Sequence, residues 1–138
     1  MRAVYTASAT ATGDGRNGHT RTSDGTLDLD VRIPKEMGGP GGATNPEQLF
    51  AAGYAACFHS ALKLVATRDK ITLTDTAITV DVGIGPNATG GYGLQVTIEA
   101  ELPGLDDTTT QDLLDKAHQV CPYSNAIRGN VDVTFTLA

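Results

Sequence analysis

The feature that most constrains this chain is the segment of residues 44–64, TNPEQLFAAGYAACFHSALKL, which is rich in small and apolar side chains. It opens with a helix signature. Asn45 is a favoured N-cap, Pro46 suits the first helical position, and Gln48 stands where a capping-box partner belongs. The sequence therefore predicts a helix from Pro46 to about Arg68.

Within this predicted helix, apolar residues recur at spacings of three and four, which is typical of one apolar stripe. The members of the stripe are Leu49, Ala52, Gly53, Ala56, Cys57 and Leu64. Most of them are small, and Gly53 costs roughly 1 kcal/mol relative to alanine inside a helix, so we expect another backbone to approach this face closely. On such a face Cys57 is either a small hydrophobic residue or a protected nucleophile.

Segments of alternating polarity on both sides of the helix predict strands. The expected strands are residues 2–12, 26–33, 76–84, 94–102 and 131–137. Turns are expected at 13–18, with Arg16 at the tip of GDGRNG, and at 23–25, so the first third is predicted to be a small antiparallel unit. The Gly/Asn-rich residues 85–93 predict a hairpin between the two longest strands.

A second helix is expected to begin at Thr108 or Thr109 and to end near Cys121, because Pro122 disfavours helix in the residue before it. Residues 123–127 are expected to form one further turn. Together, the predicted strands and helices indicate an α+β fold, antiparallel in character. The glycine-rich residues 34–43 lack the G-K-[ST] ending of a phosphate-binding loop, so we expect a flexible connector or a lid on the substrate side.

Length favours a single domain over residues 1–138. Aromatic residues make up 5% of the chain and tryptophan is absent, so we expect a core of Ala, Val, Leu and Ile, of a kind that a partner subunit often supplements. Ten basic and sixteen acidic residues give a net charge of -6 without a basic run, which argues against nucleic acid and anionic membranes as partners. We identify neither a signal-like segment nor a run of ~18 apolar residues, and expect a soluble, cytoplasmic protein.

The chain has two cysteines, Cys57 and Cys121, far apart in the sequence. They form neither a C-x-x-C motif nor the framework of a secreted protein, so they are either two unrelated buried thiols or a reversible redox couple. Peroxide chemistry would need a thiolate, a cation beside it and a second thiol. Cys57 lies too deep in its helix for the helix dipole to stabilise a thiolate. Arg16 is the candidate cation, and Glu47 at the helix start is the candidate carboxylate that orients it.

A metal site is an alternative use of the same residues. Cys57-x-His59 and His118-x-x-Cys121 offer four soft or borderline ligands, and the second pair would share a helix face. Cys57 and His59 do not converge easily, because residues two apart on a helix are rotated by roughly 200°. We therefore expect no metal, and we expect both histidines on helix surfaces.

Two segments together resemble one known family. TNPEQLFAAGYAACFHSAL around Cys57 and VCPYSNAIRGNVDV around Cys121 are similar to the organic hydroperoxide resistance (Ohr) subfamily of the OsmC/Ohr proteins. The similarity extends in order over essentially the whole chain, including GDGRNG, the glycine-rich loop and the closing strand. It implies an α+β, OsmC/Ohr-like fold in which antiparallel sheets wrap around central helices, in an intertwined homodimer with two sites near the interface.

The resemblance also implies a function, that of a thiol peroxidase which reduces organic, often fatty-acid-like, hydroperoxides to alcohols. Cys57 matches the family's peroxidatic cysteine, and Cys121 matches the resolving cysteine that forms a disulfide with it. Arg16 matches the arginine that activates the thiolate, and Glu47 matches its carboxylate partner. No bound cofactor is implied. The implied electron donor is the dithiol of a lipoylated protein or dihydrolipoamide, rather than thioredoxin or glutathione.

Two other functions stay open at this point. The chain could be an OsmC-type peroxidase of different substrate range, although the CPYS and NPEQLFAAGYAACF segments favour the organic-hydroperoxide branch. It could also be a redox-sensing or ligand-binding module whose disulfide is a signal and not a turnover intermediate. Continuous consumption of peroxide with a dithiol donor separates an enzyme from a sensor.

Overall fold

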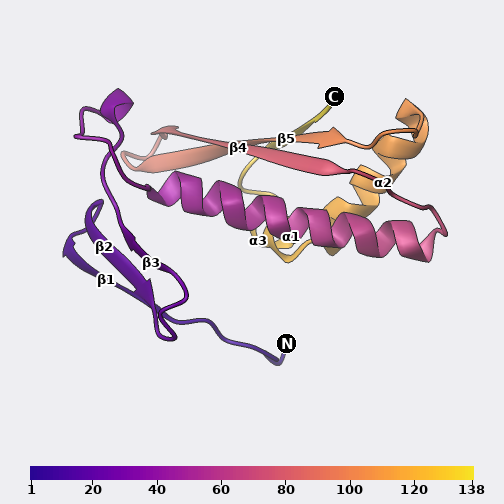
Figure 1. Cartoon of the computed structure of the whole chain (residues 1–138). Coiled ribbons are helices and arrows are strands. Elements are labelled where there is room, and N and C mark those ends of the chain that lie inside the picture. Colours follow the sequence, from indigo (N-terminus) through magenta and orange to yellow (C-terminus); the bar gives the residue numbers. More distant parts are fainter. The chain divides into compact units, whose positions relative to one another are not determined.

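Two three-stranded sheets and three α-helices make up the chain in a computed structural model that describes all 138 residues (Figure 1). The residues divide into two units, Met1–Leu49 and Phe50–Ala138, which are described one after the other. The α+β class predicted from the sequence is confirmed. A single domain over residues 1–138 stays a prediction.

The first unit holds an antiparallel sheet of β1 (Ala9–Asp14), β2 (Asn17–Thr22) and β3 (Asp28–Asp30). The pairing of Asp14 with Asn17 leaves Gly15 and Arg16 as a two-residue turn, and Gly15 takes the positive φ of 60° that such a turn requires. The predicted antiparallel unit is therefore confirmed.

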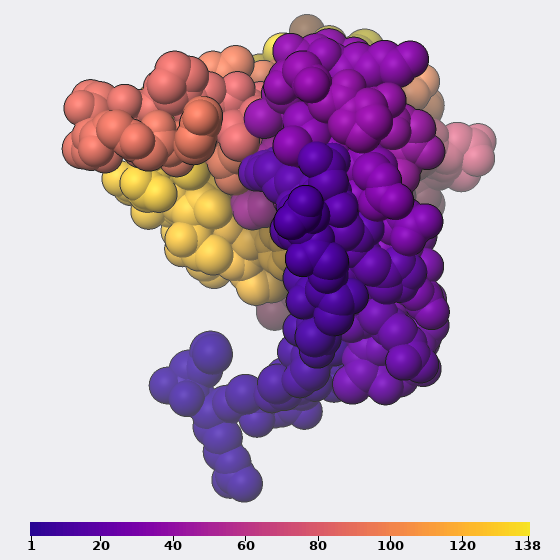
Figure 2. Space-filling view, turned by 90° about the vertical axis from the view of Figure 1, so that its left-hand side faces the viewer, coloured from indigo at the N-terminus to yellow at the C-terminus, as the bar shows by residue number.

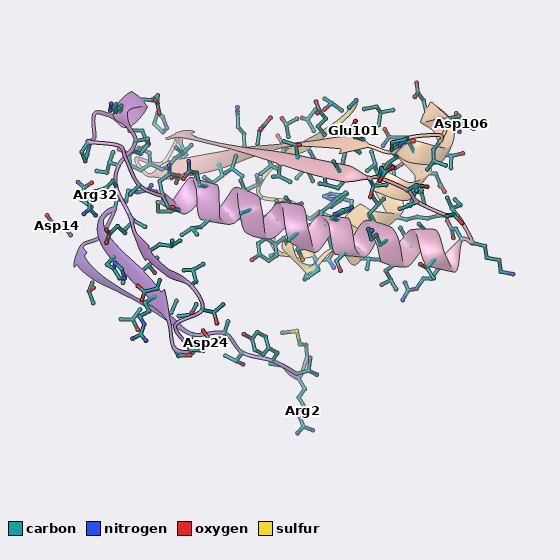
Figure 3. All side chains as sticks on the ribbon, in the orientation of Figure 1. Arg2, Asp14, Asp24, Arg32, Glu101 and Asp106 are labelled. Atoms are coloured by element: carbon teal, nitrogen blue, oxygen red, sulfur yellow. The ribbon has the colours of Figure 1, made fainter.

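The second predicted turn, at 23–25, is also present, and its contacts are local. Asp24 accepts hydrogen bonds through Oδ1 from the Thr22 hydroxyl (2.7 Å) and the Thr26 N–H (3.0 Å), and the Gly25 N–H donates to the Thr22 carbonyl at 2.9 Å (Figure 3). An aspartate that bonds its own backbone two residues on is a common turn device.

The prediction of a strand at residues 2–12 is wrong for residues 2–8. The strand begins at Ala9, and the residues before it extend as an arm from the first unit (Figure 2). Val4 and Tyr5 are 100% and 79% exposed, because no neighbouring strand is there to pair with their β-favouring sequence. The predicted strand at 26–33 shortens to β3, with one further parallel bridge between Val31 and Thr44.

The glycine-rich loop is closed by its own hydrogen bonds. It contains the 3-10 helix η1 (Lys35–Met37), and the Gly39 and Gly41 N–H groups donate to the carbonyls of Pro34 and Ile33 at 3.1 and 3.0 Å. A side chain at Gly39 would place its Cβ 2.2 Å from the Ile33 carbonyl oxygen, so this position requires glycine. Backbone donors committed in this way do not form a phosphate cradle.

The helix α1 spans Pro46–Arg68, as the sequence predicts. Asn45 caps it, because the Gln48 N–H donates to Asn45 Oδ1 at 2.9 Å. The helix begins in the first unit and continues through the second.

The apolar stripe predicted on α1 does not form the core of the second unit. Ala52, Ala56 and Leu64 are exposed. The buried residues are Tyr54, Phe58, Ala61, Leu62, Val65 and Ala66. Apolar residues occur around most of the helix, so spacing alone does not select a face, and the larger side chains take the core.

Gly53 does meet a close neighbour, but that neighbour is a side chain and not a backbone. A Cβ at this position would lie 2.9 Å from the hydroxyl of Tyr123. The glycine therefore makes room for a tyrosine ring on the helix surface.

The length and composition of α1 also overturn the expectation that no segment is long and apolar enough to cross a membrane. Only 33% of its most apolar window is buried. Length and apolar composition alone are weak evidence for a membrane span, because the core helices of soluble proteins have both properties. The apolar residues of α1 that stay unburied form a surface of the kind that marks an interaction site.

The sheet of the second unit contains β4 (Ala77–Pro86), β5 (Tyr92–Glu101) and β6 (Val133–Leu137). The predicted hairpin is confirmed, because β4 and β5 pair antiparallel. β6 pairs parallel with β5, whereas the other strand pairs are antiparallel, so the predicted antiparallel character holds for every strand pair but this one. Two helices separate β5 from β6, and a crossover connection of that length is what parallel pairing needs.

These two helices are α2 (Asp107–Val120) and α3 (Pro122–Ile127), joined at Cys121. Asp106, not Thr108 or Thr109, caps α2, since its Oδ1 accepts the Thr109 N–H at 2.7 Å (Figure 3). A carboxylate suits this position because it also meets the positive end of the helix dipole. The turn predicted after Cys121 is confirmed as α3.

The core of the second unit lies between α1, the sheet and α2. Figure 1 shows α1 running along the β4–β5 hairpin. Side chains from all three layers form one apolar cluster that includes Phe58 and Leu62 of α1, Ile98 of β5, and Leu113 and Leu114 of α2. These contacts fix the part of α1 that carries Cys57.

We expect Leu62→Ala to lower the free energy of unfolding by about 2–5 kcal/mol, because it opens a cavity where the side chain is fully buried. Leu137→Ala, at a 39% exposed position in β6, is the matched control and should cost about 1 kcal/mol or less. Urea titration of both variants measures the two values. Equal losses would contradict the assignment of the core.

Candidate active site

The first part of the candidate site is an ion pair in the first unit. Arg16, in the turn between β1 and β2, donates from Nη1 and Nη2 to the two carboxylate oxygens of Glu47, both at 2.8 Å. This fork-to-fork geometry is the strongest form of an arginine–carboxylate pair. The structure thus brings together the two residues predicted to act as cation and carboxylate.

The environment of the pair keeps both groups charged. The hydrogen bond from Arg16 lowers the pKa of Glu47, against an opposing contribution from burial. The hydrogen bond to Glu47 likewise raises the pKa of Arg16. The Glu47 side chain is only 13% exposed and that of Arg16 is 37% exposed, so the guanidinium is held at the surface with N–H groups left over for another ligand.

The second part of the site is a pair of free thiols in the second unit. Cys57 lies on α1 and is half-buried, whereas Cys121 is fully buried at the junction of α2 and α3. The Cys121 thiol points at Cys57 Sγ with 3.7 Å between the sulfurs. A disulfide needs about 2.05 Å, so the pair is reduced and close to bonding distance.

The structure therefore joins the four predicted residues into two pairs, one in each unit. Arg16 and Glu47 belong to residues 1–49, and Cys57 and Cys121 belong to residues 50–138. The approach of Arg16 to Cys57 stays a prediction.

The surroundings of Cys57 within its own unit do not favour a thiolate. Burial raises its pKa, and the neighbouring Cys121 thiol raises it further. A hydrogen bond from the backbone of Tyr123 acts in the opposite direction. These contributions agree with the argument from sequence that Cys57 needs a cation from elsewhere in the protein.

Beside Cys57 lies an aromatic cluster that the sequence analysis missed. The ring of Tyr123 packs against Phe50 and Tyr54, with centroid separations of 6.0 and 5.7 Å. The backbone of Tyr123 meets Cys57, and its side chain covers Gly53, one turn earlier on α1. The half-buried thiol is therefore bordered by apolar rings.

A buried polar chain beside the cysteines was missed as well. The Ser124 hydroxyl lies 2.5 Å from the Tyr54 hydroxyl and 2.8 Å from His118 Nδ1. Burial raises the pKa of Tyr54 and lowers the pKa of His118, so both are neutral near pH 7. Tyr54 lies three positions before Cys57 on α1, a helical spacing that could have revealed it. His118 and Ser124 lie on either side of Cys121, whose backbone is extended, so no helical spacing relates them to that cysteine.

The residues considered for a metal site make other contacts. His59 Nε2 bonds the Thr76 hydroxyl at 2.8 Å, and His118 bonds Ser124. No three His, Cys, Asp or Glu side chains are grouped as metal ligands.

We expect Glu47→Gln to lower the free energy of unfolding at pH 7 by about 0.5–1 kcal/mol, because the pair is partly exposed to solvent. The depressed pKa of Glu47 means that its contribution is present above the unfolded carboxylate pKa of about 4.3 and is lost as the pH falls through the folded value. The difference between wild type and variant should therefore shrink at pH 3.

Denaturant titrations at pH 7 and pH 3 measure that difference. Glu36→Gln is the matched control, because Glu36 is exposed and forms no ion pair. A Glu47→Gln deficit that is the same at both pH values would contradict the ionic origin of the contribution.

Comparisons with known proteins agree on one family. The family model described as OsmC-like protein matches residues 39–136. An organic hydroperoxide resistance protein of Xanthomonas axonopodis pv. citri is 56% identical over 99% of this chain and 96% of its own length. A crystal structure of an organic hydroperoxide resistance protein from Legionella pneumophila is similar with a TM-score of 0.94 and 53% identity, covering 99% of both chains. OhrB of Bacillus subtilis is similar with a TM-score of 0.89 and 45% identity, over 99% of this chain and 100% of its own. The chain belongs to the OsmC-like family, and within it to the organic hydroperoxide resistance subfamily.

Proposed function

We propose that this protein is a cysteine-based peroxidase that reduces organic hydroperoxides, including those of fatty acids, to alcohols. The observation that carries the proposal is the pair of free thiols, half-buried Cys57 and buried Cys121, with 3.7 Å between their sulfurs. The names of relatives at 45–56% identity, organic hydroperoxide resistance proteins, support the substrate class.

In the first step, the Cys57 thiolate attacks the distal oxygen of ROOH. The O–O bond breaks, Cys57 becomes a sulfenic acid, and the leaving alkoxide takes a proton to give the alcohol. Cys57 is the thiol that peroxide can reach, because Cys121 is fully buried. The rings of Phe50 and Tyr123, which are not fully buried, supply apolar surface for the organic part of the substrate.

Arg16 has two roles in this proposal. Its guanidinium stabilises the Cys57 thiolate, and it stabilises negative charge that develops on the departing oxygen. Glu47 orients the guanidinium by accepting two of its N–H groups, which leaves the others for sulfur and oxygen. The raised pKa of Cys57 within its own unit is the reason that such a cation is needed.

In the second step, the Cys121 sulfur attacks the sulfenic sulfur of Cys57. The S–O bond breaks, the hydroxyl leaves as water with the proton of the Cys121 thiol, and a Cys57–Cys121 disulfide remains. A dithiol donor of the lipoyl class then reduces this disulfide by thiol–disulfide exchange and becomes oxidised itself. No bound cofactor takes part.

We expect steady turnover of tert-butyl and fatty-acid hydroperoxides with dihydrolipoamide, and little with thioredoxin. Cys57→Ser should abolish turnover, because the attacking sulfur is lost. Cys121→Ser should allow a single stoichiometric oxidation and then stop, with Cys57 prone to over-oxidation. Peroxide consumption and intact-mass spectrometry measure these outcomes.

Three results would redirect the proposal. A Cys121→Ser variant that cycles normally with the lipoyl donor would refute the two-cysteine scheme. A disulfide that forms on oxidation but supports no turnover with any dithiol would favour a redox sensor. Preference for hydrogen peroxide over organic hydroperoxides would favour an OsmC-type enzyme of different substrate range.

We also propose that the protein is a cytoplasmic homodimer. The apolar helix α1 supports this, since two thirds of its most apolar window lies unburied in the single chain. Its exposed residues Ala52, Ala56 and Leu64 are small or apolar, and such a surface suits close packing against a second copy.

We expect the wild type to sediment at twice the chain mass of 14.3 kDa. Ala56→Glu should shift it to the monomer, because the change places a charge on the exposed face of α1. Ala88→Glu, in the β4–β5 loop, is the matched control and should leave the dimer intact. Analytical ultracentrifugation measures all three, and a monomeric wild type would overturn the proposal.

A further inference from the structure

Three helices meet at the hydroxyl of Ser124. This residue is on α3 and is fully buried, and its Oγ contacts Tyr54 of α1 at 2.5 Å and His118 of α2 at 2.8 Å. A buried hydroxyl that loses its partners carries a desolvation cost, so these contacts restrict where α3 can lie. The proposed reaction uses none of the three side chains.

The position of Cys121 depends on how α3 is docked. The Cys121 N–H ends α2 by donating to the Ala117 carbonyl at 2.8 Å, and the Cys121 carbonyl accepts the Asn125 N–H of α3 at 2.9 Å. The six residues of α3 are too few for a helix that is stable on its own. Tertiary contacts must therefore hold α3, and with it the Cys121 sulfur.

A second group of hydrogen bonds joins α2 to the end of α3. Arg128, just after α3, donates from Nη1 to Asn125 at 2.8 Å and from Nη2 to the His118 carbonyl of α2. The charged contact is exposed, the Ser124–His118 contact is partly buried, and the Ser124–Tyr54 contact is buried. The buried contact is the one that links α3 to α1, the helix that carries Cys57.

We propose that Tyr54, Ser124 and His118 are positioning residues for the resolving thiol, and that they set the rate at which Cys121 attacks oxidised Cys57. This inference rests on the proposed function. The sulfurs must close from 3.7 Å to about 2.05 Å, and a misplacement of about 1 Å can cost roughly a hundredfold in rate. The first oxidation of Cys57 does not depend on this alignment.

The rate of the second step decides the fate of Cys57. Its sulfenic acid either condenses with the Cys121 thiol, which gives the disulfide and water, or reacts with a second ROOH, which gives a sulfinic acid and an alcohol. Slower resolution therefore increases irreversible oxidation. The buried chain would protect the enzyme against its own substrate.

The test compares single-turnover kinetics of the full-length protein and its variants. After rapid mixing with one equivalent of tert-butyl hydroperoxide, sulfenic acid is trapped with dimedone and disulfide is quantified by intact mass. We expect Ser124→Ala and Tyr54→Phe to slow disulfide formation about tenfold to a hundredfold and to raise sulfinic acid under excess peroxide. The rate of Cys57 oxidation should change less than twofold.

A double variant separates positioning from a loss of stability. Ser124→Ala with Tyr54→Phe removes both hydroxyls of one hydrogen bond, so it should unfold at about the same denaturant concentration as the less stable single variant. Its disulfide formation should stay as slow as in that single variant. Tyr92→Phe, at an exposed position on β5, is the matched control and should behave as wild type.

The outcomes distinguish this inference from the proposed function. Wild-type protein that forms no Cys57–Cys121 disulfide would refute the proposed function. Wild-type protein that forms it, together with Ser124→Ala and Tyr54→Phe variants that form it equally fast, would overturn the positioning role alone. Variants whose rate falls only in proportion to their loss of folded protein would also overturn it.

Discussion

The packing of α1 in the second unit is the constraint on which the thiol pair depends. One face of the helix packs into the core against the sheet and α2, through the buried side chains of Tyr54, Phe58 and Leu62. Cys57 lies between the first two of these in sequence and is left half-buried, facing the junction of α2 and α3 where Cys121 is held. The hydrophobic contacts of a core helix therefore bring together two cysteines that are distant in the sequence.

Cys57 and Cys121 differ in their access to solvent, and this difference suits them to separate roles in the proposed reaction. The same desolvation that shields Cys57 from water raises its pKa, so protection and reactivity oppose each other at this sulfur. A fixed cation can offset that cost without adding a group that titrates near neutral pH. The Arg16–Glu47 pair has this task in the proposed mechanism, and two hydrogen bonds of 2.8 Å hold its guanidinium in one orientation and keep it charged.

Local signals predicted much of the fold, and the failures come from nonlocal contacts. The cap at Asn45 and the proline after it fixed the start of α1 correctly, and alternation located the β4–β5 hairpin. Alternation could not identify β2, whose polar sequence pairs because β1 lies beside it, nor the parallel direction of β6. Spacing did not identify the face of α1 that packs into the core, because apolar residues surround the helix. Resemblance, not spacing, paired Cys57 with Cys121, and no sequence pattern drew attention to the hydroxyl of Ser124.

In the proposed reaction, the order of events follows from the unequal access of the two thiols to solvent. A resolving thiol as exposed as the peroxidatic one would react with peroxide or external thiols on its own, and complete burial of Cys121 prevents this. Burial also removes the freedom that would let the sulfur find its target by diffusion, so its position must be built into the fold. In the arrangement proposed above, α3 meets that need at the junction where Cys121 lies, because the Ser124 hydroxyl anchors it to buried Tyr54 and half-buried His118. Protection of the second thiol and alignment for its attack are thus two consequences of one packing arrangement.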